Sequence, residues 1–225
     1  MGLKVFFDVL SQPSRAVLIF CQANGLKFTP CPVALRKGEN KKPEYTKISP
    51  FNRVPAIQDG DFTMVESPAI MEYLASKYKC APHWYPSDVE KRAKVNEFIS
   101  WYHLELRYPV SGYSYNKVMV PLVTGKPVEE KVLAAQLEKN LKAFSSIEKY
   151  FIKDKNFIAG DALSAADLIG VCEIMQFATF DLDFAKDHPK LRDWIQRVRN
   201  ETNPYFDEAH KIVYMVGKVK DPSKL

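Results

Sequence analysis

The sequence predicts an α/β domain at the amino terminus followed by an all-helical domain. In the first 78 residues, apolar runs of strand length alternate with helical segments, and Asp59-Gly60 predicts a tight hairpin turn. Beyond residue 88, apolar residues recur at intervals of three and four positions, which is the period of a helix. The segment between them contains two prolines and is predicted to be a connector. We therefore predict a first domain over residues 1–78, a connector over residues 79–88 and a second domain over residues 89–225.

The first domain is predicted to open with a strand and a helix. The strand is the short apolar run over residues 4–9, and the helix covers residues 16–22. Pro13 lies near the first turn of this helix and Gly25 lies just beyond its end. These are the positions that proline and glycine favour at helix ends.

A second strand, residues 28–35, is interrupted by Pro30 and Pro32. Prolines two positions apart place their missing N–H groups on the same side, so this strand can pair along only one edge. We therefore expect it at the border of the sheet. The remaining elements of this domain are strands over residues 54–57 and 62–65 and a helix over residues 69–78. The order predicts a small mixed sheet covered by helices.

Three helices of the second domain are predicted from apolar stripes. The stripes are Val95, Phe98, Ile99, Tyr102 and Leu106; Leu137, Leu141, Phe144 and Phe151; and Leu191, Trp194, Ile195 and Val198. Pro109 is predicted to bend or end the first helix, because its ring collides with the carbonyl four residues earlier. Ser164 and Asp167 form a predicted capping box at the start of another helix.

Composition and charge exclude several classes of protein. The net charge of +5 is spread thinly, so we expect no nucleic-acid groove. The longest stretch without a charged residue, residues 16–26, is 11 residues long and too short for a membrane helix. The four cysteines have neither metal-ligand nor C-x-x-C spacing and are interpreted as reduced thiols of an intracellular protein. No two of the four histidines stand at helical ligand spacing, so no metal site is predicted.

Several motifs, in a consistent order and at consistent separations, resemble those of cytosolic glutathione S-transferases. They are Ser11-Gln12-Pro13, Arg53 to Ile57, Glu66 to Ile70, and residues 157–160, 164–168 and 189–191. Residues 10–17, 59–63 and 84–88 resemble the theta class in particular. The likeness extends from residue 1 to about residue 215. It implies a thioredoxin-like first domain (β-α-β-α-β-β-α) that binds glutathione, a helical second domain that contributes the electrophile site, and a homodimer.

The resemblance assigns Ser11 the role of stabilising the glutathione thiolate. A free thiol has a pKa of ~8.5, so only a few per cent is ionised at pH 7. A hydroxyl that donates to the sulfur contributes ~1.5–3 kcal/mol of preference for the anion, and a helix amino terminus adds to this. The alternative is that Ser11 only caps the first helix, as a serine before proline commonly does.

The resemblance also places glutathione on backbone and helix-end groups. Val54-Pro55 is expected to be a cis peptide that turns the backbone of Val54 towards the cysteinyl part of glutathione. The alternative is an ordinary trans proline at a strand start. The helix start at Glu66-Ser67 suits the γ-glutamyl carboxylate, and Glu66 suits the ammonium group. A simple cap before Pro68 uses the same geometry, so both interpretations stand.

Four side chains are expected to complete the glutathione site. Lys41 and Arg53 suit the glycyl carboxylate, and Gln12 can hydrogen-bond near the tripeptide. Asn40 departs from the theta pattern, which has a histidine there. Asparagine is shorter and uncharged, so we expect that contact to be weaker or lost. For Lys41, Arg53 and Gln12 the alternative is a solvated surface side chain.

The electrophile site is expected on the long helix of the second domain. Arg107 occupies the position where theta-like enzymes direct an arginine towards the second substrate, where a cation stabilises a departing anion. The alternative is a surface arginine beside Glu105. Four further side chains either line an apolar pocket or belong to the helical core: Tyr108, Tyr113, Tyr115 and Met119.

The sequence therefore predicts a glutathione transferase of detoxification, with glutathione as a co-substrate and no cofactor. Its expected electrophiles are small, apolar compounds that carry a halogen or a sulfate group. Reduction of organic hydroperoxides is expected as a side activity. The alternative is a non-catalytic binding or scaffold protein of the same fold. A cytosolic location is expected, although Ser223-Lys224-Leu225 also matches a peroxisomal targeting signal. Theta-like chains usually continue into a helix over the active site, so a natural end at Leu225 predicts a more open site.

Overall fold

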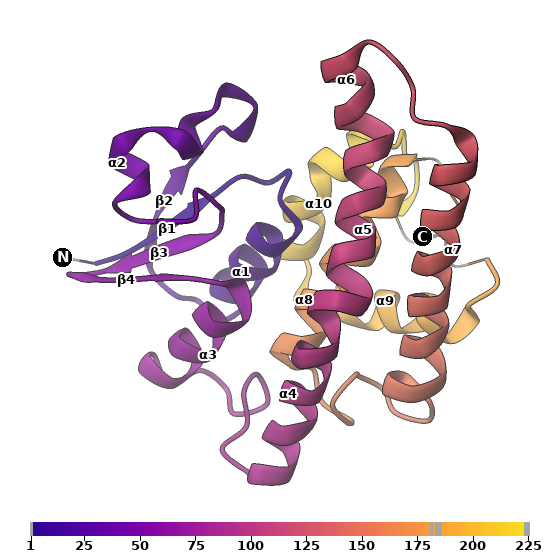
Figure 1. Cartoon of the computed structure of the whole chain (residues 1–225). Coiled ribbons are helices and arrows are strands. Elements are labelled where there is room, and N and C mark those ends of the chain that lie inside the picture. The colour runs from indigo at the N-terminus through magenta and orange to yellow at the C-terminus, as the bar shows by residue number, and fades with distance from the viewer. Residues whose placement is uncertain (1, 181, 183–185, 223–225) are drawn as a thin grey trace.

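The computed structural model of the chain describes residues 2–180, 182 and 186–222. The fold class agrees with the prediction, since a thioredoxin-like domain with a four-stranded mixed sheet lies beside an all-helical domain (Figure 1). None of the helices within the described ranges is long and apolar enough to cross a bilayer. The predicted peroxisomal targeting signal, Ser223-Lys224-Leu225, lies outside the described residues.

The first domain has the element order that the resemblance implied. It consists of β1 (Leu3–Phe7), α1 (Gln12–Ala23), β2 (Phe28–Pro32), the 3-10 turns η1 (Leu35–Lys37) and η2 (Glu39–Lys41), α2 (Pro43–Thr46), β3 (Ala56–Asp59), β4 (Phe62–Val65) and α3 (Ser67–Lys77). The strand order is β2-β1-β3-β4, with β1 and β2 parallel and the other neighbours antiparallel. The strand with two prolines, β2, lies at the border of the sheet, as predicted.

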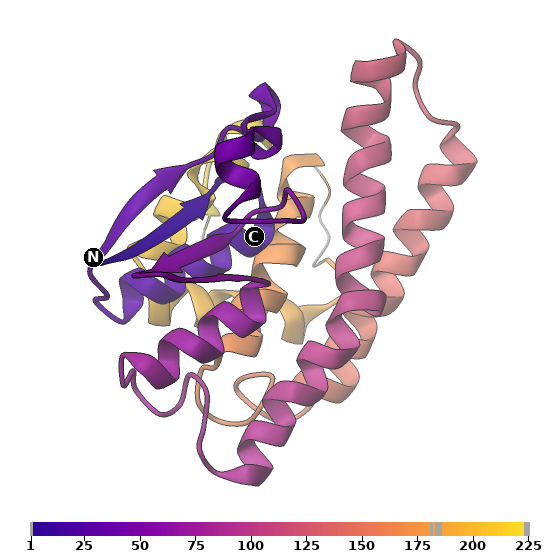
Figure 2. The same cartoon turned by 60° about the vertical axis from the view of Figure 1, so that its left-hand side comes forward.

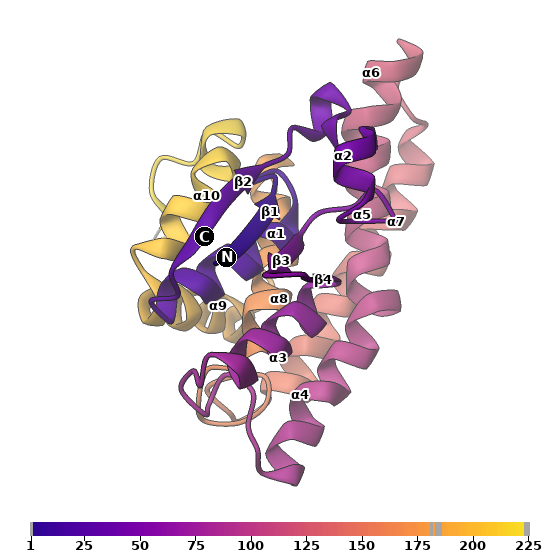
Figure 3. The ribbon, with the colours of Figure 1, turned by 90° about the vertical axis from the view of Figure 1, so that its left-hand side faces the viewer.

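Different helices cover the two faces of the sheet (Figure 3). Side chains of one face, such as Val5 and Ile57, join the main core with α1 and α3. Side chains of the other face, such as Phe6 and Ala56, pack near Tyr45 of α2 in a smaller core. This division follows from the alternation of side chains along a strand. Both cores therefore fix the edge of the sheet where β1 ends and β3 begins.

Within the described residues, the secondary structure of the second domain is helical apart from one isolated bridge between Phe157 and Gly160. It consists of α4 (Val89–Tyr102), the π-helical turn η3 (His103–Arg107), α5 (Tyr108–Ser114), the π-helical turn η4 (Tyr115–Met119), α6 (Val120–Thr124), α7 (Glu130–Ser146), the π-helical turn η5 (Ile147–Ile152), α8 (Ala165–Ile174), the 3-10 segment η6 (Met175–Phe180), α9 (Pro189–Thr202) and α10 (Tyr205–Val216). Figure 2 shows the long stretch from α4 to α6 running beside α7. Every residue of α8 is buried, and α1 packs against α8 and α10, which joins the two domains.

Of the two outcomes predicted at Pro109, an end of the helix is wrong, because the chain stays helical from α4 through α6. Immediately before Pro109 the backbone adopts the wider turn η3, in which the N–H of Tyr108 bonds to the carbonyl of His103. The carbonyl that the proline ring would otherwise meet belongs to Glu105, inside this wider turn. A π-helical turn of this kind gives the ring room without ending the helix.

The predicted capping box is present at the start of α8. Ser164 and Asp167 bond reciprocally. The Asp167 carboxylate also accepts the backbone N–H of Ile158 and the indole N–H of Trp194, each at 2.8 Å. One buried carboxylate thereby ties the start of α8 to the preceding loop and to α9.

Replacing Ser164 with alanine is expected to lower the free energy of unfolding by about 1–2 kcal/mol, the effect of losing an N-cap hydroxyl. Chemical denaturation of the variant and the native chain measures this difference. Ser146→Ala is the matched control, because that hydroxyl bonds backwards to the carbonyl of Lys142 on an exposed helix surface. Equal stability of the two variants would show that the cap does not contribute.

Candidate functional site

The loops that carry Ser11 and Val54 meet at one edge of the sheet. Phe6 of β1 pairs with Ala56 of β3, and the two strands are antiparallel. The end of β1 therefore lies beside the start of β3. Ser11 follows β1 and Val54 precedes β3, so the Ser11 hydroxyl oxygen comes to 3.5 Å from the carbonyl oxygen of Val54.

Ser11 is the N-cap of α1. Its Oγ accepts the backbone N–H of Ser14 at 3.4 Å and donates to the carbonyl of Val54 at 3.5 Å. Both contacts are longer than ordinary hydrogen bonds, which for O–H···O are ~2.7–2.8 Å. The capping interpretation therefore holds. The hydroxyl proton is only weakly engaged, and it lies at the positive end of a helix dipole.

The backbone groups predicted to receive a peptide-like ligand lie near Ser11. Val54-Pro55 is a cis peptide, as expected. Glu66 has φ = 71° and precedes α3, whose first residue is the buried Ser67. The first N–H groups of a helix have no partner inside it, so the start of α3 offers donors to an anion.

A small cavity of about 100 Å³ lies between the two domains at this point, and we call it the polar cavity. The first domain contributes Arg53, Val54, Pro55, Glu66 and Ser67 to its lining. The second domain contributes residues at the end of α4 and in η3, including Arg107. Five of the residues predicted to contact glutathione thus come together.

A second, larger cavity of about 420 Å³ lies alongside, and we call it the apolar cavity. Gln12 and Tyr115 line it, and so do aliphatic side chains of η4 and α10. Arg107 lines both cavities. Ser11 itself lines neither cavity. Its neighbours Leu10 and Gln12 line the apolar cavity, and Pro13, two residues after Ser11, lines the polar cavity. The two cavities therefore adjoin the same turn.

Two predicted glutathione ligands lie apart from the cavities. Lys41 is exposed and lines neither of them. Asn40 donates from Nδ2 to the carbonyl of Asn52 at 2.8 Å, so its side chain braces the loop that leads to Arg53. Asn40 therefore contacts the backbone of this loop and lines neither cavity.

One predicted electrophile contact, Tyr108, requires correction. Tyr108 is 75% exposed and lines a groove towards α7, because the residue after Arg107 is turned about 100° around a helix axis. For Tyr113 the alternative of a core residue holds, since it is buried and stacked on Phe177. Met119 and Tyr115, by contrast, line the apolar cavity.

Arg107 is paired with a residue that the sequence prediction missed. Its Nη1 lies 3.0 and 3.1 Å from the two carboxylate oxygens of Glu173 in α8, and the Tyr102 hydroxyl donates to the same carboxylate at 3.1 Å. Burial raises the pKa of Glu173, and the Arg107 guanidinium opposes that rise. The expected partner, Glu105, is exposed. A lone glutamate within the apolar run of α8 was the signal that could have identified this pair.

Arg15 was also missed. It is fully buried, it lines the apolar cavity, and its guanidinium contacts residues of both domains. Its position directly before the apolar run of α1 was the available signal, and arginine is almost never fully buried without partners.

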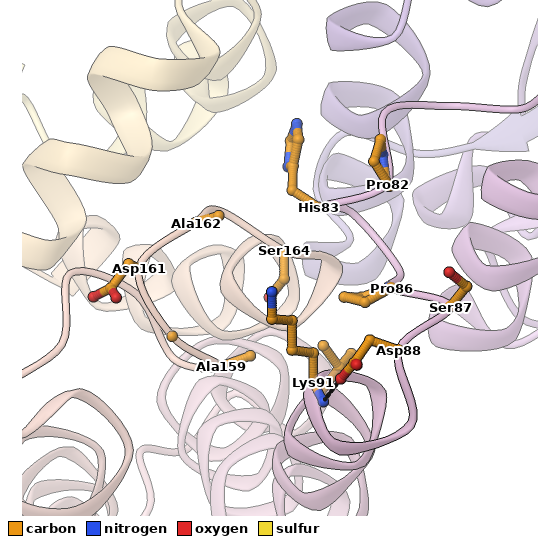
Figure 4. Close-up of a pocket in the computed structure, with 12 residues that line it drawn as sticks. Pro82, His83, Pro86, Ser87, Asp88, Lys91, Ala159, Asp161, Ala162 and Ser164 are labelled. Carbon is orange, nitrogen blue, oxygen red and sulfur yellow. Dashed lines mark hydrogen bonds between the residues drawn. The ribbon is translucent and has the colours of Figure 1, made fainter.

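A further hollow of about 490 Å³ lies at the junction of the connector, the start of α4 and the loop before α8 (Figure 4). Asp88 caps α4 there by accepting the N–H of Lys91 at 2.9 Å, and His83 Nδ1 lies 2.6 Å from the carbonyl of Leu163. None of the predicted site residues lines this hollow. Among the described residues, no cluster of histidine, cysteine, aspartate and glutamate has the arrangement of a metal site.

Comparison with known proteins finds relatives over nearly the whole chain. Residues 1–76 match the family model "Glutathione S-transferase, N-terminal domain" and residues 114–201 match "Glutathione S-transferase, C-terminal domain". The chain is 37% identical to glutathione S-transferase theta-3 of Mus musculus over 222 residues, covering 98% of this chain and 91% of the relative. It is 40% identical to glutathione S-transferase T1 of Arabidopsis thaliana over 223 residues, covering 96% and 91%. A human theta-class glutathione transferase, solved in complex with the glutathione conjugate of 1-menaphthyl sulfate, superposes with a TM-score of 0.92 at 35% identity, covering 97% of this chain and 89% of that one.

Proposed function

The chain belongs to the glutathione S-transferase family, and on that premise we propose that Ser11 holds bound glutathione as a thiolate that attacks an electrophile in the apolar cavity. The observation that carries this proposal is the position of the Ser11 hydroxyl. It caps α1, its two hydrogen bonds are long, and it lies beside Val54 where the two cavities adjoin. A sulfur atom placed there would accept the hydroxyl proton as a charge-assisted hydrogen bond.

The polar cavity and its rim supply the groups that hold glutathione. The backbone of Val54 pairs with the cysteinyl unit, the start of α3 at Ser67 receives the γ-glutamyl carboxylate, and Glu66 receives the ammonium group. Arg53 contacts the glycyl carboxylate. Gln12 supplies a further hydrogen bond from the side of the apolar cavity.

The apolar cavity holds the second substrate, and Arg107 faces the leaving group. The thiolate sulfur forms a bond to the electrophilic carbon, and the leaving group departs with its bonding electron pair as a halide or sulfate anion. A cation at this point stabilises the charge that develops. The relative solved with the glutathione conjugate of 1-menaphthyl sulfate supports this choice of substrate class. Reduction of organic hydroperoxides by the same thiolate, a homodimeric state and a cytosolic location belong to the same proposal.

Ultraviolet difference spectroscopy of bound glutathione as a function of pH tests the proposal. We expect the bound thiol to ionise about two pH units below the free thiol. Glutathione that binds but titrates like the free tripeptide would contradict the proposal for Ser11. Absence of any glutathione binding would favour the non-catalytic scaffold, which the theta-class relatives do not favour.

Replacing Arg53 with glutamine is expected to raise KM for glutathione roughly three- to fivefold, since an exposed charge pair contributes up to about 1 kcal/mol. The difference should shrink at high salt, because screening weakens an exposed pair. Steady-state kinetics at two ionic strengths measures both effects. Lys41→Gln and Lys42→Gln are matched controls, since these lysines are exposed and line neither cavity. A larger effect at Lys41 than at Arg53 would reverse the assignment of the glycyl carboxylate.

A further inference from the structure

The guanidinium of Arg15 is fully buried and binds acceptors from both domains. Nη1 donates to the carbonyl of Val9 at 2.9 Å and to that of Leu10 at 3.4 Å. Nη2 donates to the carbonyl of Cys172 at 3.1 Å and to Oε1 of Gln176 at 3.0 Å. All four acceptors are neutral, and Nε has no hydrogen-bond partner.

The acceptors of Nη1 lie in the turn that carries Ser11. The amide of Ser11 donates to the carbonyl of Asp8 at 2.9 Å, and the amide of Leu10 donates to the Asp8 carboxylate at 2.9 Å. Asp8 therefore accepts the hydrogen bonds of the amides in this turn, and Arg15 donates hydrogen bonds to its carbonyls. The carbonyl of Leu10 and the amide of Ser11 belong to one planar peptide unit, so fixing one fixes the other.

The acceptors of Nη2 anchor the same guanidinium in the helical domain. Cys172 lies in α8 and Gln176 in η6, and α1 packs against α8 (Figure 1). Arginine presents its N–H groups in a rigid planar fork. The position of the Ser11 turn is therefore set by α8 and η6 as well as by its own backbone.

Packing alone does not require a charged side chain at this point. Burying a cation among neutral acceptors costs free energy, and apolar side chains of similar volume commonly replace buried ionic groups without loss of stability. We propose that Arg15 is a positioning residue for Ser11, which keeps the hydroxyl directed at the glutathione sulfur. This inference rests on the proposed function of Ser11.

The ionisable groups around Arg15 come from three other elements. Glu173 of α8 and Arg107 of η3 act on it electrostatically, in opposite directions. Burial raises the pKa of the Cys172 thiol to about 12. Burial, aided by the charge of Arg15, lowers the pKa of His210 of α10 to about 3. Neither Cys172 nor His210 therefore ionises in the range where bound glutathione titrates.

The variant Arg15→Lys tests the proposal, because lysine keeps the positive charge but lacks the planar guanidinium that donates to the Ser11 turn and to the helical domain at once. We expect the thiol pKa of bound glutathione to rise by about one unit and kcat at pH 7 to fall about tenfold, with little change in KM for glutathione. The double variant Ser11→Gly/Arg15→Lys should titrate like Ser11→Gly alone, since a residue that acts only through Ser11 has nothing left to position. Asn140→Ala, which removes a fully buried polar side chain elsewhere in the helical domain, is the control for loss of stability.

An unchanged thiol pKa in folded Arg15→Lys would overturn the proposal, and so would additive shifts in the double variant. Where Arg15→Lys does not fold, Gln176→Met takes its place, because it removes one acceptor of the Arg15 guanidinium. The thiol pKa of bound glutathione should again rise, and an unchanged pKa would overturn the proposal. The two hypotheses fail separately. No shift in Ser11→Gly refutes the proposed function, whereas a shift in Ser11→Gly without one in Arg15→Lys refutes the role of Arg15 only.

Discussion

Replacing Ser11 with glycine is expected to lower kcat/KM for conjugation roughly 20- to 50-fold at pH 7 while the domain stays folded. The hydroxyl caps α1 and is also proposed to hold the sulfur, so alanine would disturb both functions. Glycine separates them, because it replaces an N-cap serine at a loss of only about a few tenths of a kcal/mol. The loss of activity then reports the missing hydrogen bond to sulfur.

The pH profile of this variant gives the sharper measurement. In the native enzyme the rate should rise with pH through the lowered thiol pKa and then level off. Without the Ser11 hydroxyl, the rising part of the pH–rate profile should shift about two pH units upwards, towards the pKa of the free thiol. Ser11→Thr keeps a hydroxyl and should retain most of the activity. A profile of Ser11→Gly that coincides with that of the native enzyme would show that another group ionises the thiol.

Replacing Arg107 with methionine is expected to lower the free energy of unfolding by about 3 kcal/mol at pH 8. Arg107 is partly exposed, with 31% of its side chain accessible, but Glu173 is 1% exposed and would remain as a buried carboxylate that keeps the hydrogen bond from the Tyr102 hydroxyl and loses its ion pair. An uncompensated buried charge is the costly product of breaking such a pair. Urea denaturation measures the difference.

The loss in this variant should be smaller at pH 5 than at pH 8. Burial already raises the pKa of Glu173, and removing the Arg107 guanidinium raises it further. A carboxyl whose pKa is higher in the folded than in the unfolded state favours folding only while it is protonated, so the variant loses stability as the pH rises through the folded-state pKa. The double variant Arg107→Met/Glu173→Leu should regain most of the stability, since it leaves no buried carboxylate without its partner. A pH-independent loss would mean that Glu173 is not the group responsible.

The elements that could be predicted from the sequence depend on local signals. The two prolines of β2 placed it at the border of the sheet, and Ser164 with Asp167 marked the start of α8. Each signal acts within a few residues, and local backbone chemistry decides the outcome. The meeting of Ser11 and Val54 was expected from the family resemblance, and the pairing of β1 with β3 supplies its physical basis.

The parts that could not be predicted depend on distant contacts or on helix rotation. Glu173 lies 66 residues after Arg107, and Cys172 lies 157 residues after Arg15, so no local pattern joins these pairs. Tyr108 was assigned to the electrophile site, but it lines a groove towards α7, whereas its neighbour Arg107 lines the apolar cavity, so the assignment depended on the rotation of the helix. The wider turn η3 depends on how the helix accommodates Pro109, which a rule for regular helices does not describe.

Most of the residues that line the apolar cavity belong to the helical domain, among them those of η4, η6 and α10, whereas Ser11 and Val54 belong to the sheet domain. Laboratory evolution could therefore diversify η4 and α10 and alter which compounds the enzyme accepts, while the residues proposed to ionise the glutathione thiol stay unchanged. Exchanging these helices with those of a relative should likewise transfer its substrate range together with them.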